Sequence, residues 1–311
     1  DPDASELSRS VAYVAPKTLE EKELVAVWES VLKREAVGLN DNFYELGGDS
    51  IKSIQVASRL KQSGYVLQVS DLLQTPILGI LANKLTGVTR EIDQSLVTGE
   101  VLLTPIQYSF LSSKNYANKS HYNQTVVLES VSGIDGLLLE ESLSYLVKHH
   151  DALRMVYKEE EGKWLQYNTR LDAKGYSIDQ YDLSQSKDAQ LEMSELCNAL
   201  QTSIVLAQGP LFKVGLFHLQ EKDCVVLIVH HLVVDGVSWR ILLEDLSLVY
   251  SSLKKKEKVV LPLKTDSFQY WSKLLNDYAF SDTLEKEQSY WEDVLSKSVT
   301  PLYSDDPNQD I

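Results

Sequence analysis

The sequence predicts two domains of different fold class: a small all-α helical bundle, followed by a larger α/β layered domain. Apolar residues recur at helical spacing through residues 18–85, the pattern lapses from 86 to 101, and strand-like and helix-like segments then alternate. The length of 311 residues fits two domains. A composition with 43% apolar and 24% charged residues is that of an ordinary globular protein and excludes collagen-like, low-complexity and disordered chains.

The charge and the cysteine content narrow the class of function. A formal net charge of −15 argues against general nucleic-acid binding, which needs cations to displace the counterions of phosphate. Cys197 and Cys224 are too few for a disulfide framework and lack the spacing of a metal site. No apolar run approaches the ~18 residues of a membrane span, and residues 1–10 lack the basic and apolar regions of a secretory signal. We therefore expect a cytoplasmic protein without membrane or nucleic-acid partners.

Three or four helices are predicted in the first domain, which would form a small all-α four-helix bundle. A Thr-Leu-Glu-Glu capping box starts a helix over residues 18–33. A second helix is predicted from the apolar stripe Ile51, Ile54, Ala57 and Leu60. Thr75 and Pro76 are a suitable N-cap and first helical residue for another helix, which ends near Leu85. Domains of this size often fold alone.

Strands and helices alternate in the second domain. Strands are predicted over residues 124–129, 212–219 and 224–229, and helices over residues 137–149 and 238–250. The strand at 224–229 is a continuous apolar run, which is typical of a strand buried on both faces. Interleaved strands and helices form layered α/β domains.

Residues 47–50, with the sequence Gly-Gly-Asp-Ser, lie at the predicted start of the second helix. Glycines tolerate backbone angles that other residues resist, and they let another group approach closely. With Asp49 or Ser50 at the N-cap, the serine hydroxyl is expected at an exposed helix start, near unpaired N–H groups that favour an attached phosphodiester. A Ser or Asp before an apolar stripe is often only a cap, so these four residues alone do not establish such a role.

The longer stretch DNFYELGGDSIKSIQVASRL resembles the peptidyl carrier domain of non-ribosomal peptide synthetases, and the resemblance covers residues 14–86. It implies that Ser50 bears a covalent 4′-phosphopantetheine arm, attached by a phosphopantetheinyl transferase, with Asp49 and Gly48 beside it. The thiol of that arm would carry an aminoacyl or peptidyl thioester. Many carrier domains have His in place of Asp49, and the Asp variant resembles carriers that precede an epimerisation domain.

Two adjacent histidines follow the apolar run at 224–229. His230 and His231 are expected to point to opposite faces of the strand end, so that at most one faces a given cavity. Burial lowers the pKa of an imidazole in such a place, which keeps the ring neutral and available as a base. Asp235 and Gly236 are expected to form a turn into the next helix. The alternative is one core histidine, one exposed histidine and a turn aspartate, all without a catalytic role.

The pattern HHxxxDG over residues 230–236 resembles the signature of the condensation-domain superfamily, whose fold is similar to that of chloramphenicol acetyltransferase. Two further segments resemble motifs of that superfamily and occur in the same order along the chain, LTPIQ at 103–107 and HHDALR at 149–154. His149 and His150 end a predicted helix, where the helix dipole favours cations, so their expected role is local. Arg154 is a weaker candidate for support of the catalytic loop.

The same resemblance implies the roles of individual residues. His231 would be the catalytic acid/base and His230 would support it. Asp235 would be structural, paired with an arginine that the sequence does not identify, and Gly236 would be a structural turn residue. No metal site is expected.

The run HHLVVDGVSWRILLEDLSLVY resembles epimerisation domains more than amide-forming condensation domains, in agreement with the Asp variant of the carrier motif. Epimerisation of an aminoacyl thioester (L to D) removes the Cα proton from one face and returns a proton to the other, which calls for two positioned acid–base groups. Ser50 would tether the substrate and so raise its effective concentration, while His231 transfers a proton or stabilises the developing charge. Two alternatives stay open: a condensation domain that forms amide bonds between carrier-bound substrates, and a non-catalytic carrier-docking module.

The resemblance also predicts the organisation of the chain. Residues 1–13 would be a leader, 14–86 the carrier domain, 87–100 a linker, and 101–311 the N-terminal lobe of an epimerisation domain, with a loop at 305–311. The family's second catalytic group is a glutamate in an EGHGRE-like motif of a second lobe, and no such segment occurs here, so these 311 residues alone are not expected to complete the reaction. An upstream adenylation domain, a downstream condensation domain and a role in antibiotic biosynthesis are further implications.

Overall fold

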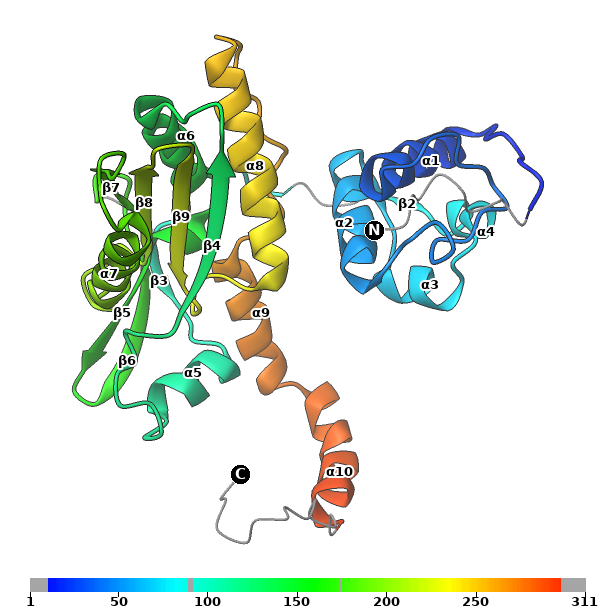
Figure 1. Ribbon diagram of the computed structural model, residues 1–311. Helices are drawn as coiled ribbons and strands as arrows, with labels where there is room; N and C mark the ends of the chain where they lie inside the picture. Colours follow the sequence, from blue (N-terminus) through cyan, green and yellow to red (C-terminus); the bar gives the residue numbers. More distant parts are fainter. Residues whose placement is uncertain (1–10, 89–91, 174, 298–311) are drawn as a thin grey trace, which may run out of the picture. The chain divides into compact units, whose positions relative to one another are not determined.

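The computed structural model describes residues 11–88, 92–173 and 175–297 (Figure 1). The chain divides into two compact units. One unit comprises Asp1–Leu96, Leu137–His149 and Asp235–Asp266, and the other comprises Val97–Gly136, His150–Val234 and Ser267–Ile311. The predicted loop at 305–311 and residues 1–10 of the predicted leader lie outside the described residues.

Four helices form the N-terminal part of the first unit. They are α1 (Leu19–Leu32), α2 (Ser50–Gln62), α3 (Val69–Gln74) and α4 (Leu78–Ala82), accompanied by an antiparallel pair of short strands, β1 (Tyr65–Val66) and β2 (Thr86–Gly87). Helix α1 packs against α2 and α4, and α2 packs against α3. The predicted capping box is present, since the Thr18 side chain accepts the Glu21 N–H. The rings of Trp28 and Phe43 meet edge to face in the core, with centroids 5.1 Å apart. The predicted four-helix bundle is confirmed.

The predicted third helix over residues 75–85 is wrong. Thr75 is the C-cap of α3, and α4 begins only at Leu78. Pro76 lies between the two helices because its carbonyl accepts the Phe43 N–H at 2.8 Å and the next residue forms a β-bridge with Asn42. This pairing with a distant loop holds the segment extended, so the proline separates two short helices and does not start one.

The buried face of α2 also differs from the predicted stripe. Ser53, Val56 and Leu60 are buried, whereas Ile54 is exposed. The Ser53 hydroxyl donates a hydrogen bond to the Ser50 carbonyl at 2.6 Å, and this internal partner lets a polar residue enter the core. A search for apolar residues at helical spacing misses a buried serine of this kind.

Two sheets form the centre of the second unit (Figure 1). The four-stranded sheet has the order β4-β9-β8-β7, and its strands are β4 (Asn123–Ser130), β7 (Ser177–Asp182), β8 (Phe212–His218) and β9 (Asp223–His230). The three-stranded sheet has the order β3-β6-β5, and its strands are β3 (Gly99–Val101), β5 (Met155–Glu160) and β6 (Lys163–Asn168). Strands β7 and β8 are parallel, whereas the other strand pairs in the two sheets are antiparallel. Helix α7 (Ala189–Thr202) packs on β8 and β9, which confirms the predicted α/β layering.

The remaining helices are α5 (Pro105–Ser112), α6 (Gly136–His149), the short 3-10 helix η1 (Asp151–Arg154), α8 (Gly236–Lys254), α9 (Phe268–Ala279) and α10 (Asp282–Ser296). The three predicted strands agree with β4, β8 and β9 to within one residue at each end. Helix α8 is longer than predicted at both ends. None of the described helices has the length and apolar character needed to cross a membrane.

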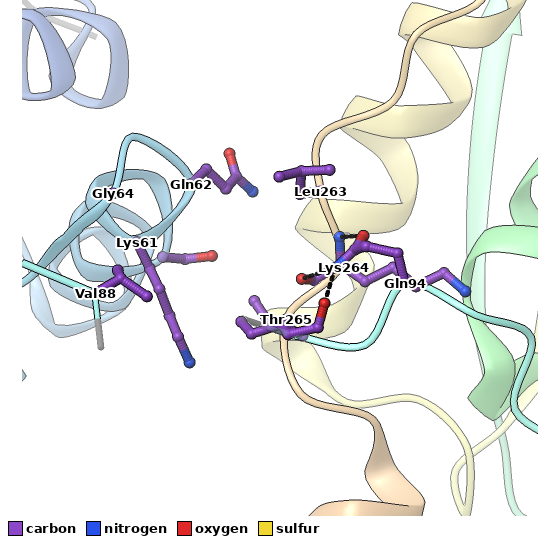
Figure 2. A pocket seen from close by; sticks show the side chains of 10 residues that line it. Lys61, Gln62, Gly64, Val88, Gln94, Leu263, Lys264 and Thr265 are labelled. Atoms are coloured by element: carbon purple, nitrogen blue, oxygen red, sulfur yellow. Dashed lines mark hydrogen bonds between the residues drawn. The ribbon is translucent and has the colours of Figure 1, made fainter. Parts of the chain in front are cut away.

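Part of the predicted linker, residues 87–100, is held by reciprocal amide hydrogen bonds. Gln94 Nε2 donates to the Lys264 carbonyl at 3.1 Å, and Gln94 Oε1 accepts the Lys264 N–H at 2.8 Å (Figure 2). The ammonium group of Lys264 also donates to the Ser95 carbonyl at 3.1 Å. This stretch is therefore paired with the segment that follows α8. The predicted domain boundaries themselves stay predictions.

Candidate functional site

Ser50 is the first residue of α2, and its side chain is exposed. The N-cap is Asp49, whose Oδ1 accepts the N–H groups of Ile51 and Lys52, both at 2.8 Å. These hydrogen bonds, the one from Lys52 foremost, hold the pKa of Asp49 below its ordinary value. Of the two residues that could have capped the helix, it is therefore the aspartate that does so, and the serine hydroxyl stands outside the cap.

The two glycines before Asp49 serve different purposes. Gly47 has a φ of +89°, in the left-handed region that glycine adopts readily. Gly48 was expected to let another group approach, but a Cβ at this position would lie 2.4 Å from the Phe43 ring. The Gly48 N–H also donates to the Phe43 carbonyl at 2.8 Å. Gly48 thus lets its own loop pack closely on the core.

The start of α2 fits an attached phosphodiester. The cap uses the N–H groups of Ile51 and Lys52, so what the helix N-terminus offers an attached phosphodiester is the positive end of the dipole. Lys52, whose ammonium donates to the Gly47 carbonyl at 2.6 Å, adds a positive charge to the same turn. Within the described part of the chain, Ser50 Oγ has no hydrogen-bond partner, so its hydroxyl is available for modification.

The strand register explains how the two histidines diverge. Asn123 on β4 pairs with His230, and the ladder continues past β9, since the His231 N–H donates to the Tyr122 carbonyl at 2.8 Å. Successive residues of a strand point to opposite faces. His230 is fully buried and His231 is exposed, as the alternation predicts. Gln124 lies two residues beyond Tyr122, on the face that His231 shares.

His230 is held as a neutral ring. Its Nδ1 accepts the Leu232 N–H at 3.2 Å, so the hydrogen is on Nε2, which donates to the Lys119 carbonyl at 2.8 Å. Burial lowers the pKa of His230 to about 4. The predicted neutral imidazole is therefore found at His230, where it ties the loop after β9 to the loop before β4.

His231 is oriented by hydrogen bonds and by stacking. Its Nδ1 lies 2.8 Å from the Val234 carbonyl, which can only accept, so Nδ1 carries the hydrogen of the neutral ring. The Tyr122 ring stacks on the imidazole with centroids 5.5 Å apart and planes 13° apart. The lone pair of Nε2 then faces Gln124, whose amide nitrogen is 3.2 Å away. This arrangement allows Nε2 to accept a proton.

Asp235 is the N-cap of α8. Its Oδ1 accepts the Val237 N–H at 3.1 Å, and the N–H and hydroxyl of Ser238 at 2.7 Å each. Among the residues that the structure describes, no arginine forms an ion pair with Asp235, and the pairing stays a prediction. The prediction of a turn at Gly236 is wrong, because the Asp235 cap makes Gly236 the first residue of α8.

Two buried side chains that the sequence analysis missed support the loop after His231. Tyr157 is fully buried and its hydroxyl donates to the Leu232 carbonyl at 3.1 Å. Gln107 Nε2 donates to the Tyr157 hydroxyl at 3.1 Å. Burial raises the pKa of Tyr157, so its hydroxyl stays protonated as a donor. Gln107 belongs to the LTPIQ segment, which was a usable signal, whereas Tyr157 lies in no motif.

Arg154 is buried beside the three-stranded sheet. Its Nη2 donates to the Val97 carbonyl at 2.8 Å and its Nε to the Thr169 carbonyl at 3.3 Å. Burial lowers the pKa of Arg154, although the nearby Asp151 opposes that change. These two bonds join the chain before β3 to the end of β6.

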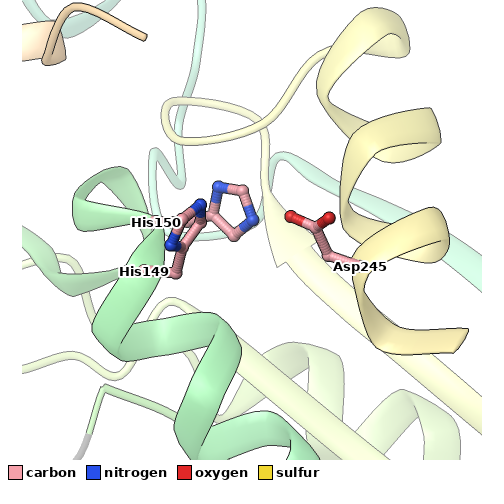
Figure 3. A group of neighbouring side chains, drawn as sticks. All are labelled: His149, His150 and Asp245. Carbon is pink, nitrogen blue, oxygen red and sulfur yellow. The ribbon is translucent and has the colours of Figure 1, made fainter. Parts of the chain in front are cut away.

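Figure 3 shows the two histidines at the end of α6 with Asp245, a buried residue of α8. His149 and Asp245 both belong to the first unit. A ring nitrogen of His149 lies within 4.8 Å of a carboxylate oxygen of Asp245. His150 directly follows His149 in the chain. A buried carboxylate needs a partner, and an imidazole can provide one. The absence of a metal site stays a prediction.

Models of two protein families match the chain. Residues 22–85 match the phosphopantetheine attachment site, and residues 97–310 match the condensation domain. Tyrocidine synthase 2 of Brevibacillus parabrevis is 43% identical over 295 residues, which are 95% of this chain and 8% of that protein. Surfactin synthase subunit 1 of Bacillus subtilis (strain 168) is 44% identical over 289 residues, 92% of this chain and 8% of that protein. This chain thus spans less than a tenth of these two relatives.

Solved structures give the same fold. The epimerization domain from the third module of tyrocidine synthetase B is 42% identical, with a TM-score of 0.65, over 68% of this chain and 48% of that chain. The starter condensation domain of rhizomide synthetase is 20% identical, with a TM-score of 0.57, over 65% of this chain and 49% of that chain. The predicted helical carrier region and the fold similar to chloramphenicol acetyltransferase are confirmed. The chain therefore belongs to the condensation-domain family of non-ribosomal peptide synthetases, with a phosphopantetheine carrier domain on its N-terminal side.

Proposed function

We propose that Ser50 carries an aminoacyl or peptidyl thioester on a 4′-phosphopantetheine arm, and that the condensation-type domain epimerises the Cα of that group with His231 as the acid/base. The observation that carries the proposal is the hydrogen bond from His231 Nδ1–H to the Val234 carbonyl at 2.8 Å. It gives the neutral ring a proton acceptor at Nε2. A general base needs such an atom within reach of the proton that it removes.

The choice of epimerisation is supported by the degree of similarity to the two structures. Identity to the epimerization domain is 42%, against 20% for the starter condensation domain, over similar shares of this chain. The aspartate at position 49, which resembles carriers that precede an epimerisation domain, favours the same reaction. These two indications come from separate domains.

The arm, when bound, supplies a thioester whose carbonyl makes the adjacent Cα–H acidic. His231 Nε2 would take the Cα proton, and the Nδ1–H bond to Val234 would stabilise the cation that forms. His230, whose pKa is lowered to about 4, stays neutral at pH 7 and so adds no positive charge beside that cation. A second acid, of the carboxylic class that the family resemblance implies, would return a proton to the opposite face.

Amide bond formation is the second candidate. The family model that matches residues 97–310 is that of the condensation domain. A neutral His231 with its lone pair on Nε2 would also accept a proton from an amine that attacks a thioester. The site geometry is compatible with both reactions.

Chirality of the bound group separates the two candidates. In the parent synthetase, an L-aminoacyl group loaded on Ser50 is released by hydrolysis after incubation and resolved on a chiral column. Epimerisation predicts that the D form accumulates in the wild type and not in His231→Ala. His218→Gln is the control, since His218 pairs with Asp223 at the far end of β8 and β9. Retention of the L form, with amide product when a second loaded carrier is added, would establish condensation instead.

The proposal includes the partners that such a reaction needs. A phosphopantetheinyl transferase would modify Ser50, an upstream adenylation domain would supply the amino acid, and a downstream condensation domain would use the product. A cytoplasmic location and a role in antibiotic biosynthesis by this chain's parent belong to the same proposal.

A further inference from the structure

The side chain of Gln124 contacts the reacting nitrogen of the proposed site. It lies at the start of β4, on the face that His231 shares, and its amide nitrogen is 3.2 Å from His231 Nε2. Glutamine cannot take a proton near neutral pH, so Gln124 can act there only through hydrogen bonds. Its effect depends on whether the NH₂ group or the carbonyl oxygen of the carboxamide faces the imidazole.

The His231 tautomer determines the orientation of the Gln124 amide. Because Nδ1–H is committed to the Val234 carbonyl, Nε2 of the neutral ring presents a lone pair. A carbonyl oxygen facing that lone pair would be repelled, whereas an NH₂ group donates to it. The two side chains therefore form an N–H···N bond with Gln124 as the donor.

This bond changes partner when a proton is transferred. Once Nε2 has taken a proton it no longer accepts, so the hydrogen bond from the Gln124 N–H to Nε2 is broken. At the same moment, negative charge grows on the carbonyl oxygen of the substrate, which becomes a stronger acceptor. Donors directed at such an oxygen typically contribute ~10²–10³-fold to the rate.

We propose that Gln124 is a catalytic residue whose N–H is bonded to His231 Nε2 in the resting site and to the thioester carbonyl oxygen during proton transfer. The inference rests on the proposed function. In the step itself the Cα–H bond breaks, an N–H bond forms at Nε2, and the electron pair of the broken bond moves toward the carbonyl oxygen. The imidazole gains the proton that the substrate loses, so atoms and charge balance.

A substitution of similar size tests the donor. Gln124→Met removes the N–H, and we expect the rate of Cα exchange in the loaded parent synthetase to fall by about 10²-fold. Amide hydrogen exchange of β4 and β9 should be unchanged, which separates a catalytic defect from a folding defect in this domain. Gln185→Met is the matched control and should exchange at the wild-type rate, since Gln185 is exposed and follows β7, at the opposite edge of the four-stranded sheet from β4. An exchange rate for Gln124→Met equal to that of the wild type would overturn the inference.

A second readout does not depend on activity. Nitrogen-15 NMR of the histidine rings in the 311-residue chain reports the tautomer and titration of His231. We expect hydrogen on Nδ1 in the wild type. In Gln124→Glu the donor becomes a carboxylate, while Nδ1–H keeps its bond to the Val234 carbonyl, so the ring should take a second hydrogen on Nε2 and be found with hydrogen on both nitrogens. A ring in Gln124→Glu that is protonated as in the wild type would contradict the contact.

The two readouts separate this inference from the proposed function. If the wild-type parent shows no Cα exchange, the proposed function fails and the substrate role of Gln124 fails with it, while the NMR result still decides the resting contact. If exchange requires His231 and tolerates Gln124→Met, the function stands and only this inference falls.

Discussion

Helices α2 and α8 begin in the same way, yet the residues that matter near them are held very differently. Both helices start after an aspartate whose Oδ1 accepts the N–H groups of the second and third residues that follow. At α2 the proposed functional residue, Ser50, comes after the cap and is exposed. Near α8 the proposed functional residue, His231, comes before the cap, and hydrogen bonds and a stacked ring orient it.

The difference follows from the two tasks. A residue that bears a flexible arm must be exposed to the enzyme that attaches the arm. The orientation of its own side chain matters little, because the arm itself carries the substrate to the other site. A residue that moves a proton must present one atom in one protonation state, so its ring requires partners at both nitrogens and on its face. The carrier domain thus needs only a helix cap and an exposed serine hydroxyl, while the proposed site at His231 needs several residues that orient the imidazole.

The largest expected effect is at Ser50. Ser50→Ala removes the attachment oxygen, so incubation with coenzyme A and a phosphopantetheinyl transferase should give no increase in intact mass, where the wild type gains one arm. Ser70→Ala, at another exposed helical serine of the carrier domain, should load normally. Loading of Ser50→Ala would show that another residue carries the arm.

The next effect concerns the buried histidine. Because the pKa of His230 falls to about 4 on folding, the unfolded chain binds more protons between that value and the ordinary 6.5, and stability decreases as the pH falls. At ~1.4 kcal/mol per unit, the loss between pH 6.5 and 4 is on the order of 3 kcal/mol. Amide hydrogen exchange of β9 measures it. His230→Gln retains a donor but does not titrate, so its stability should vary less with pH; an identical pH dependence would assign the effect to other groups.

A smaller effect is expected at Tyr157. Tyr157→Phe removes the 3.1 Å hydrogen bond to the Leu232 carbonyl, which keeps a 3.4 Å bond from Gln107 Nε2, and it also removes the hydroxyl that accepts from Gln107. The free energy of unfolding should fall by roughly 1–2 kcal/mol. If the loop geometry matters, the rate of Cα exchange should fall as well, with loading of Ser50 unchanged. Tyr167→Phe, in the neighbouring strand β6, is the control. A stable variant with a full exchange rate would show that Leu232 needs no such support.

The smallest effects are those of the two caps. Asp49→Ala and Asp235→Ala should each destabilise their helix by about 1 kcal/mol, as measured by hydrogen exchange of the first turn, and the corresponding Asn variants should lose less. The pKa of Asp49 is lowered in the folded state, so its contribution is present above the ordinary value of ~3.9 and is lost as the pH falls through the lowered value. A cap effect at Asp49 that persists unchanged to the lowest pH would contradict this assignment.

The sequence predicted those features that depend on local pattern. The continuous apolar run gave β9 to within one residue, and strand alternation gave the opposite orientation of the two histidines. Features that depend on contacts between distant segments were missed. The break at Pro76 depends on the loop at Phe43, and the closeness of Gly48 to the Phe43 ring has no counterpart in the pattern of residues.

The candidate site was also predicted only as far as local sequence patterns reach. The resemblance of the motif pointed to His231, but the side chains around it come from β4, α5 and β5, which the motif does not contain. Gln124 and Tyr157 are separated from His231 by 107 and 74 residues of the printed sequence. Polar residues in strands carry no local signal of what they will contact, so only the folded chain brings them together.

The most direct test of epimerisation by His231 is deuterium wash-in at Cα. The parent synthetase, loaded on Ser50 with an L-aminoacyl group, is placed in D₂O, and the released amino acid is analysed by mass spectrometry. We expect a gain of one deuterium at Cα in the wild type, and a rate lower by ~10²–10⁴-fold in His231→Ala. No deuterium in the loaded wild type, or the same rate of gain in His231→Ala, would contradict epimerisation by His231.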